Sequence, residues 1–323
     1  MIPLITLEEH YFSPAFLEQA NAYVEQMKWI PGLVERLTDM GAGRLAAMDA
    51  GAVSLQVLSH GPGLATASAA TCSAANDRAA AAVRAEGGKR LAAFAVLPMG
   101  LPDDAARELR RCVAQLGFVG ALVDSHAAGR HYDGSEFWPV FAAAQDLDVP
   151  IYLHPAFPTG DMEQLFQGNY SAAAAISMGS SGFGWHADVG LHVLKLFAAG
   201  VFDAFPRLKI IIGHMGEMLP FMHERIAALS VRWGQLKRPW RVVYDENIWI
   251  TTSGVWSLSP MACLLRNTKI DKILYSVDYP FAKNEDGLKF MEELEKSGLV
   301  TEEQFEKIGY RNAEQLLKLK VRQ

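Results

Sequence analysis

Short runs of apolar residues recur along the chain, and each is followed by a longer segment with helix-like composition. Such runs, bounded by Gly, Pro and Ser, indicate buried strands. Several are continuous in Val, Ile and Leu, as expected for parallel strands covered on both faces. The predicted strands span residues 4–10, 53–58, 91–97, 118–123, 150–153, 208–212, 248–252 and 273–277. The predicted helices end near residue 50, cover 68–86, 102–116, 135–147 and 188–199, end near 235, begin at 259–260, and cover 283–296.

Eight strand–helix units in a chain of 323 residues predict an α/β fold, the (β/α)8 TIM barrel. Residues 13–38 do not fit the repeat and are interpreted as a small insertion over the end of the first strand. Thr301 and Gln304 form a capping-box pattern that opens an extra C-terminal helix. A doubly wound sheet is the alternative, disfavoured because no Gly-rich phosphate loop follows the first strand. With no change in composition along the chain, residues 1–323 are predicted to form a single domain.

One connection is much longer than the others. Residues 157–186 are rich in Gly, Ala and Ser, with aromatic residues between them. A long loop within a compact domain is often a lid or a binding loop. Its Phe157, Phe183 and Trp185, together with Phe281, could form a slot for a planar ring, and Trp29 could belong to a lid.

Composition narrows the functional class. Half the residues are hydrophobic and the net charge is −6, with both signs mixed along the chain. No basic patch indicates a nucleic-acid partner, and no apolar run is long enough to cross a bilayer. The N-terminus lacks the positive region of a signal peptide. Three widely spaced cysteines, Cys72, Cys112 and Cys263, favour free thiols in a reducing compartment, so we expect a cytoplasmic protein.

Metal-capable side chains stand at the ends of the predicted strands. Side chains alternate along a strand, so Glu8 and His10 point the same way and Glu9 points the opposite way. The carboxyl ends of all barrel strands meet at one face. Carboxylates and imidazoles together suit a divalent transition metal such as Zn, Mn, Fe or Ni. The residues expected at this face are Glu8, His10, His60, Asp124, His126, His154, His214 and Asp278.

Each of these residues also has a structural interpretation. His154 could be a buried histidine bonded to backbone, and Asp278 could cap the helix that follows it. Glu8 and His10 could be solvated residues at a strand end. Arg225 could form a salt bridge on a helix surface. The other histidines at positions 131, 186, 192 and 223 are interpreted as structural.

The strand ends carry a family resemblance. The chain resembles the amidohydrolase superfamily, and within it the metal-dependent decarboxylases of the aminocarboxymuconate-semialdehyde decarboxylase type. It is most similar there to the γ-resorcylate, 5-carboxyvanillate and 2,3-dihydroxybenzoate decarboxylases. The resemblance spans nearly the whole chain. It rests on the stretches Leu7-Glu8-Glu9-His10, Tyr152-Leu153-His154-Pro155, Ile212-Gly213-His214-Met215-Gly216-Glu217, Ile250-Thr251-Thr252-Ser253-Gly254, Ser276-Val277-Asp278-Tyr279-Pro280-Phe281 and Ile308-Gly309-Tyr310-Arg311-Asn312-Ala313.

The resemblance implies roles for single residues. One divalent ion, Zn or Mn, would be held by four ligands: Glu8, His10, His154 and Asp278. His214 would lie beside the ion as a catalytic imidazole, held by Glu217. Two-metal relatives carry a modified lysine at the end of the fourth strand, where this chain has Asp124, so a single ion is expected. The substrate-binding residues implied are Arg225, opposite the substrate carboxylate, and Asp124, Phe281, His60 and Trp185.

The implied reaction is the non-oxidative decarboxylation of a hydroxybenzoate or similar aromatic acid. The ion would chelate the carboxylate and phenolate oxygens, while Asp278 protonates the ring carbon and His214 hydrogen-bonds the phenolic oxygen. A metal-dependent hydrolase of an amide, ester or lactone is the alternative, and a barrel without activity that serves as a binding protein is a third. Apolar residues on one helix face, Leu191, Leu194 and Phe197, suggest a homodimer or homotetramer.

Overall fold

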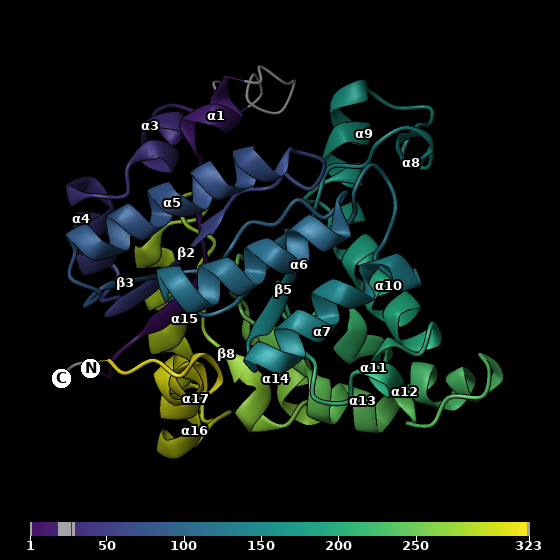
Figure 1. Ribbon diagram of the computed structural model, residues 1–323. Coiled ribbons are helices and arrows are strands. Elements are labelled where there is room, and N and C mark those ends of the chain that lie inside the picture. Colours follow the sequence, from purple (N-terminus) through teal and green to yellow (C-terminus); the bar gives the residue numbers. More distant parts are fainter. Residues whose placement is uncertain (1, 19–26, 28–29, 322–323) are drawn as a thin grey trace.

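The computed structural model describes residues 2–18, 27 and 30–321 of the chain. All eight predicted strands are present, although the third and the eighth are shorter than predicted (Figure 1). Trp29, which the sequence suggested as part of a lid, lies outside the described residues. The strands are β1 (Ile5–Tyr11), β2 (Leu55–His60), β3 (Leu91–Ala93), β4 (Ala121–Asp124), β5 (Pro150–His154), β6 (Lys209–Ile212), β7 (Ile248–Thr251) and β8 (Ile273–Leu274).

The strands pair in parallel and in chain order. Strands β1 to β3 form one run and β4 to β8 another. A parallel bridge between Ala95 and Ala121 joins the two runs. At the other seam the His10 amide donates to the Tyr279 carbonyl at 2.6 Å, and the Leu7 and Glu8 amides donate to the Ser276 hydroxyl. The sheet therefore closes into the predicted (β/α)8 barrel.

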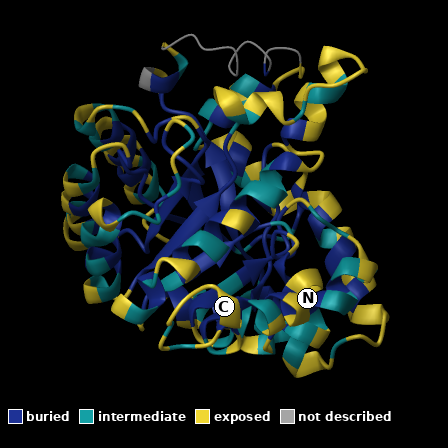
Figure 2. Ribbon diagram, turned by 90° about the vertical axis from the view of Figure 1, so that its right-hand side faces the viewer, coloured by how far each residue is buried: buried dark blue, intermediate teal, exposed yellow. Residues whose placement is uncertain are grey.

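Helices surround the barrel, and exposed residues lie mainly on their outer faces while the strands are buried (Figure 2). The predicted helices follow the strands in the predicted order, and two further helices, Val201–Ala204 and Trp240–Asn247, were not predicted. Together they are α4 (Ala42–Ala50), α5 (Ala69–Ala85), α6 (Pro102–Arg111), α7 (Trp138–Leu147), α10 (Gly184–Ala198), α11 (Val201–Ala204), α12 (Leu219–Leu229), α13 (Trp240–Asn247), α14 (Leu258–Asn267) and α15 (Asn284–Lys296). Short π or 3-10 turns lie at Cys112–Leu116, Ser135–Phe137, Ser230–Arg232, Ile270–Lys272 and Lys307–Arg311.

Two insertions rise from the carboxyl ends of strands. After β1 come α1 (Pro14–Leu17) and α3 (Leu33–Thr38), and after β5 come α8 (Asp161–Gln164) and α9 (Ala172–Gly179). Figure 1 shows both pairs at the top of the molecule, at the same end of the barrel. The long 157–186 connection is therefore partly helical.

The chain ends in α16 (Glu302–Glu306) and α17 (Asn312–Leu317). The Thr301–Gln304 capping box is confirmed, since each side chain bonds the other residue's backbone N–H. The three cysteines are free, as predicted. In the described part of the chain, no helix is both long and apolar enough to cross a membrane.

Phe197, one residue of the predicted oligomer face, is not exposed to a second copy of the chain. Phe197 is buried, and its ring packs 5.4 Å from that of Trp240. Leu191, by contrast, is 52% exposed. The prediction that Phe197 packs against a second copy is wrong, because this side of α10 already covers the barrel's own helices.

Candidate metal centre and active site

Strands β1, β5 and β8 bring four predicted ligands together. Ligand atoms of Glu8, His10 and His154 all lie within 4.8 Å of one another, and all three residues are buried. Asp278 follows β8, and its Oδ1 lies 3.3 Å from His10 Nε2. The strand register places the end of β5 level with β4, since His154 pairs with Asp124. The predicted convergence of strand-end side chains is therefore present in the structure.

The arrangement of charges in this cluster suits a bound cation. The Nδ1 atom of His154 lies 2.7 Å from the Pro155 carbonyl and donates to it, so Nε2 faces Glu8 Oε1 at 3.1 Å. Within the described residues, Glu8 Oε1 and His10 Nε2 are buried without a hydrogen-bond partner. Burial alone lowers the pKa of His154, but Glu8 and Asp278 outweigh it and raise that pKa. The raised pKa means that a proton is held between His154 and the carboxylates, in the place where a divalent ion would replace it.

A hydrogen bond from Tyr152 fixes the Glu8 carboxylate. Its second oxygen accepts a hydrogen bond from the Tyr152 hydroxyl, which lies 2.7 Å from Thr251 Oγ1. A Cβ at Gly213 would lie 2.8 Å from Glu8 Oε2 and 3.0 Å from the Tyr152 hydroxyl. The glycine before His214 is therefore required for close approach to the cluster. Groups of this kind orient metal ligands.

A second set of polar residues lies beside the first. His214 Nδ1 donates to Glu217 Oε1 at 2.7 Å, which directs Nε2 toward Glu8 Oε1, 3.7 Å away. Burial alone lowers the pKa of His214, but Glu217 and Glu8 outweigh it and raise that pKa to about 10. The predicted pairing of His214 with Glu217 is confirmed.

His186 is a site residue that the sequence interpretation missed. Its Nδ1 lies 2.7 Å from Glu217 Oε2, and its ring centroid is 4.7 Å from that of His214. Burial alone raises the pKa of Glu217, but the His214 and His186 imidazoles outweigh it and lower that pKa. His186 follows a loop of irregular pattern and precedes no motif, so no sequence signal marked it.

Glu9 was predicted to point away from Glu8, and it faces β8. Its carboxylate accepts from the backbone N–H groups of Val277 and Tyr279 and from the Ser276 hydroxyl, each at 3.0 Å. Burial raises the pKa of Glu9 to about 8. Because its partners flank Asp278, Glu9 fixes the loop that presents this residue. The pairing of β1 with β2 shifts register between Thr6 and Glu9, an irregularity of the kind found next to active sites.

The backbone itself is strained around the site. Asp278 has φ = +75°, and His214 and Glu217 have φ = +49° and +52°. Non-glycine residues rarely adopt this region, and they tend to do so at functional sites. The loops after β6 and β8 therefore hold their side chains in positions that ordinary turns would not supply.

Three of the predicted substrate-binding residues, Phe281, Trp185 and Asp124, differ from one another in exposure and contacts. Phe281 is 40% exposed, and its ring lies edge-on to that of His10 with the two centroids 5.6 Å apart. Trp185 packs edge-on against Phe157 at 4.9 Å. Asp124 is buried and accepts from the amides of Gly63 and Ala65. Burial raises the pKa of Asp124.

His60 and Arg225 do not join this group. His60 Nδ1 donates to the Gly61 carbonyl at 2.7 Å and Nε2 accepts from the Ser13 amide at 3.1 Å. Burial lowers the pKa of His60 to about 4. Both ring nitrogens are used within the protein, so the prediction that His60 binds substrate is wrong; it ties β2 to the N-terminal insertion. Arg225 is exposed on α12, whereas the cluster is buried.

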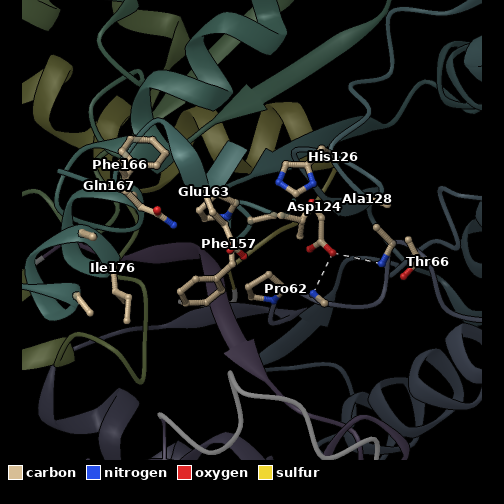
Figure 3. A pocket seen from close by; sticks show the side chains of 18 residues that line it. Pro62, Thr66, Asp124, His126, Ala128, Phe157, Glu163, Phe166, Gln167 and Ile176 are labelled. Atoms are coloured by element: carbon tan, nitrogen blue, oxygen red, sulfur yellow. Dashed lines mark hydrogen bonds between the residues drawn. The ribbon is translucent and has the colours of Figure 1, made fainter. Parts of the chain in front are cut away.

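A cavity of about 770 Å³ lies beside the cluster (Figure 3). It begins at Asp124 and at Ala156, two residues after His154, and extends beneath α8 and α9. Figure 3 shows Asp124 and His126 on one side of it and Phe166 and Ile176 on the other. The 157–186 connection therefore forms part of its wall, as predicted for a binding loop.

Comparison with known proteins finds relatives of one class, the decarboxylases. "Decarboxylase orsB" of Emericella nidulans is 54% identical over 325 residues, covering 99% of this chain and 98% of its own. The γ-resorcylate decarboxylase of a Polaromonas species is 34% identical over 333 residues, covering 98% of both chains. Both relatives named here are decarboxylases and match along their whole lengths.

A solved structure shows the same architecture. It is a dihydroxybenzoic acid decarboxylase from Polaromonas with bound manganese and the inhibitor 2-nitroresorcinol. It superposes with a TM-score of 0.87 at 33% identity, covering 98% of this chain and 97% of that one. The family model described as Amidohydrolase matches residues 10–319. With the barrel, the strand-end cluster and these matches in agreement, the chain belongs to the amidohydrolase family.

Proposed function

We propose that this protein is a metal-dependent, non-oxidative decarboxylase of a hydroxybenzoate-type acid. The observation that carries the proposal is the pair of buried acceptors, Glu8 Oε1 and His10 Nε2, that have no hydrogen-bond partner in the described residues. They lie beside His154 and Asp278, in a chain whose full-length relatives are decarboxylases. Structural histidines and carboxylates would have found donors instead.

Four residues would hold the ion: Glu8, His10, His154 and Asp278. When bound, a divalent ion such as the manganese of the Polaromonas enzyme supplies a Lewis acid that stabilises negative charge on the substrate oxygens. Strand four ends at Asp124, where no lysine is available to bridge two ions. The proposed site therefore holds one ion.

The residues of this chain would then donate and accept the protons of the reaction. Asp278, held by the Glu9-fixed loop, gives its proton to the ring carbon that bears the carboxylate. The carbon–carbon bond breaks, carbon dioxide leaves and the ring regains aromaticity with that proton in place. His214 Nε2 donates a hydrogen bond to the phenolic oxygen while Glu217 accepts from Nδ1. Asp278, with its side chain 19% exposed, regains a proton from water.

Phe281 and Trp185 are proposed as walls of the ring site, and Asp124 as a polar contact at its edge. Arg225 is left out, because it is exposed on α12. The hydrolase alternative is not favoured, since the relatives and the solved structure named above are decarboxylases. A barrel without activity is disfavoured by the intact ligand set.

The test is carbon dioxide release from a panel of hydroxybenzoates, including γ-resorcylate, by the metal-loaded protein. We predict release by wild type and a fall in kcat of about 10²–10⁴-fold in Asp278→Asn at equal metal content. Asp286→Asn, an exposed change on α15, serves as control and keeps the wild-type rate. Full activity in Asp278→Asn would rule out its role as proton donor. Loaded wild type that releases nothing from any acid would contradict the function.

We also propose that the protein is a cytoplasmic homodimer or homotetramer. Exposed apolar side chains support an oligomer: Phe221 on α12 is 82% exposed, and Val231 just after it is 77% exposed. Light scattering during size-exclusion chromatography measures the state. A monomer at micromolar concentration would contradict this proposal without affecting the site.

A further inference from the structure

The cavity beside the metal cluster is larger than one aromatic ring needs. Its volume of about 770 Å³ is in the range of about 300–1,000 Å³ found for pockets that enclose drug-sized ligands. None of the cluster residues lines the cavity, so a hydroxybenzoate bound at the cluster would meet it only at the inner end, near Asp124 and Ala156. The outer part, beneath α8 and α9, would remain open to a further group.

The side of the outer part that α9 contributes is apolar, whereas Glu163 and Gln167 line the cavity from α8 and the turn after it. Four residues of α9 line it, Ala172, Ala175, Ile176 and Gly179, and their spacing places them on one face of the helix. A Cβ at Gly179 would lie 3.0 Å from the Phe166 ring, so the absence of a side chain there lets Phe166 pack as a second wall. The small alanine side chains leave the space between α9 and the barrel unfilled.

Phe157 connects the inner and outer parts. It follows β5 shortly after the ligand His154 and contacts Trp185 edge-on at 4.9 Å. Figure 3 shows Phe157 between Asp124 on the barrel side and Ile176 on the helix side. A ring bound at the cluster would therefore extend past Phe157 into the apolar part.

The charges of the lining decide what the further group can be. Asp124 and Glu163 both line the cavity, and none of its lining residues in the described chain is Lys or Arg. Burial lowers the pKa of His126, the one lining histidine, so it supplies little positive charge. An anionic substituent would be repelled here, whereas an uncharged apolar one would gain contact area.

From the size, lining and charge of this cavity, we infer that the substrate is a hydroxybenzoate carrying an alkyl chain or another apolar substituent. The inference rests on the proposed function and specifies its substrate class. The acid and hydroxyl groups bind at the cluster, and the substituent lies between Phe157, Phe166 and the Ala172–Gly179 face of α9. The cavity is thus a specificity subsite.

The test is a series of dihydroxybenzoates with hydrogen, methyl, propyl or pentyl at one free ring position, taken for each position in turn. At the position that points into the cavity, kcat/KM should rise up to about fourfold for each methylene that becomes buried. Calorimetry with the matching alkylresorcinol products provides a readout independent of turnover, and their affinity should rise in the same order. Rates and affinities that stay flat or fall with chain length at every position would overturn the inference.

A pair of variants on α9 makes the test specific. Ala175→Trp fills the cavity and should lower the ratio of pentyl to unsubstituted kcat/KM about tenfold; Ala172→Phe is a second variant if the first does not fold. Ala173→Trp, on the exposed face of α9, should leave that ratio unchanged. An unchanged ratio in both cavity variants would overturn the inference while leaving the proposed function standing. Release from no acid at all would overturn the proposed function, and the inference with it.

Discussion

Two buried ligand atoms, Glu8 Oε1 and His10 Nε2, indicate a metal site. An unsatisfied buried acceptor costs about 1–3 kcal/mol, and Glu8 Oε1 and His10 Nε2 are two such atoms side by side. Glu8 is at the same time fixed by Tyr152, so it cannot turn toward water. Such a cost is tolerated where a bound cation offsets it.

At the residue scale, we predict that His186→Ala lowers kcat about tenfold with little change in KM. The variant removes the 2.7 Å contact to Glu217, so this carboxylate holds His214 Nδ1 less firmly. Steady-state kinetics on the metal-loaded protein measure the effect. His223→Ala, which removes a buried histidine on α12, is the control. A kcat equal to wild type in His186→Ala would show that His214 needs no such support.

Site residues could be predicted from the sequence where they lie at or just after the end of an apolar run. His154 ends strand β5 and Asp278 follows strand β8, and the barrel places both at one face. His60 met the same criterion, but its partners Ser13 and Phe16 come from an insertion whose path no periodicity predicts. His186 and the clamp by Glu9 depend on contacts between distant segments, which spacing along the chain cannot show.

At the element scale, a buried carboxylate joins two helices. Glu108 on α6 accepts from Asn76 of α5 at 2.7 Å, from Ser73 at 2.8 Å and from Arg111. Burial alone raises the pKa of Glu108, but Arg111, Asn76 and Ser73 outweigh it and lower that pKa below its ordinary value of 4.5. Its contribution to stability is therefore complete above about pH 4.5 and is lost as the pH falls through the lowered pKa.

We predict that the free energy of unfolding of wild type falls more steeply between about pH 5 and pH 3 than that of Glu108→Gln. The glutamine cannot be protonated in this range, so its interactions do not titrate. Urea unfolding at both pH values measures the difference. Glu293→Gln, exposed on α15, should behave like wild type. Equal losses in wild type and Glu108→Gln would contradict the assignment.

Elements were predictable where periodicity was strong and unpredictable where packing decides. The order of strands and flanking helices followed from the apolar runs, and the capping box located α16. Helices α8 and α9 were hidden in a Gly- and Ser-rich stretch, and α13 was not predicted because tertiary contact stabilises it: Trp240 and Tyr244 pack inward. Strand β8 has only two residues, because the backbone turns early to present Asp278.

At the scale of the whole molecule, the count of strands predicted closure, since eight parallel strands return β8 to β1. The seam has one backbone hydrogen bond, from His10 to Tyr279, and is otherwise made by side chains: Ser276 and Glu9 bridge the two segments. The proposed metal ligands Glu8 and Asp278 lie on opposite sides of this seam. A bound ion would therefore link the first strand to the last.

We predict that metal binding stabilises the whole fold. At a free metal concentration of about 100 times Kd, the free energy of unfolding should rise by about 2.7 kcal/mol. With residues 1–323 proposed as a single domain, urea unfolding should show one transition that shifts as a whole. Glu8→Gln, which removes a ligand charge, should lose most of the gain. A transition that manganese does not move, or that splits in two, would contradict this account.

The most direct test of the central claim is a titration of metal-free protein with Mn²⁺, in which bound metal and carbon dioxide release from γ-resorcylate are measured in the same samples. We expect saturation at a single ion per chain, with release rising in proportion to bound metal. Release at the full rate from metal-free protein, or failure to bind any ion at this site, would contradict it.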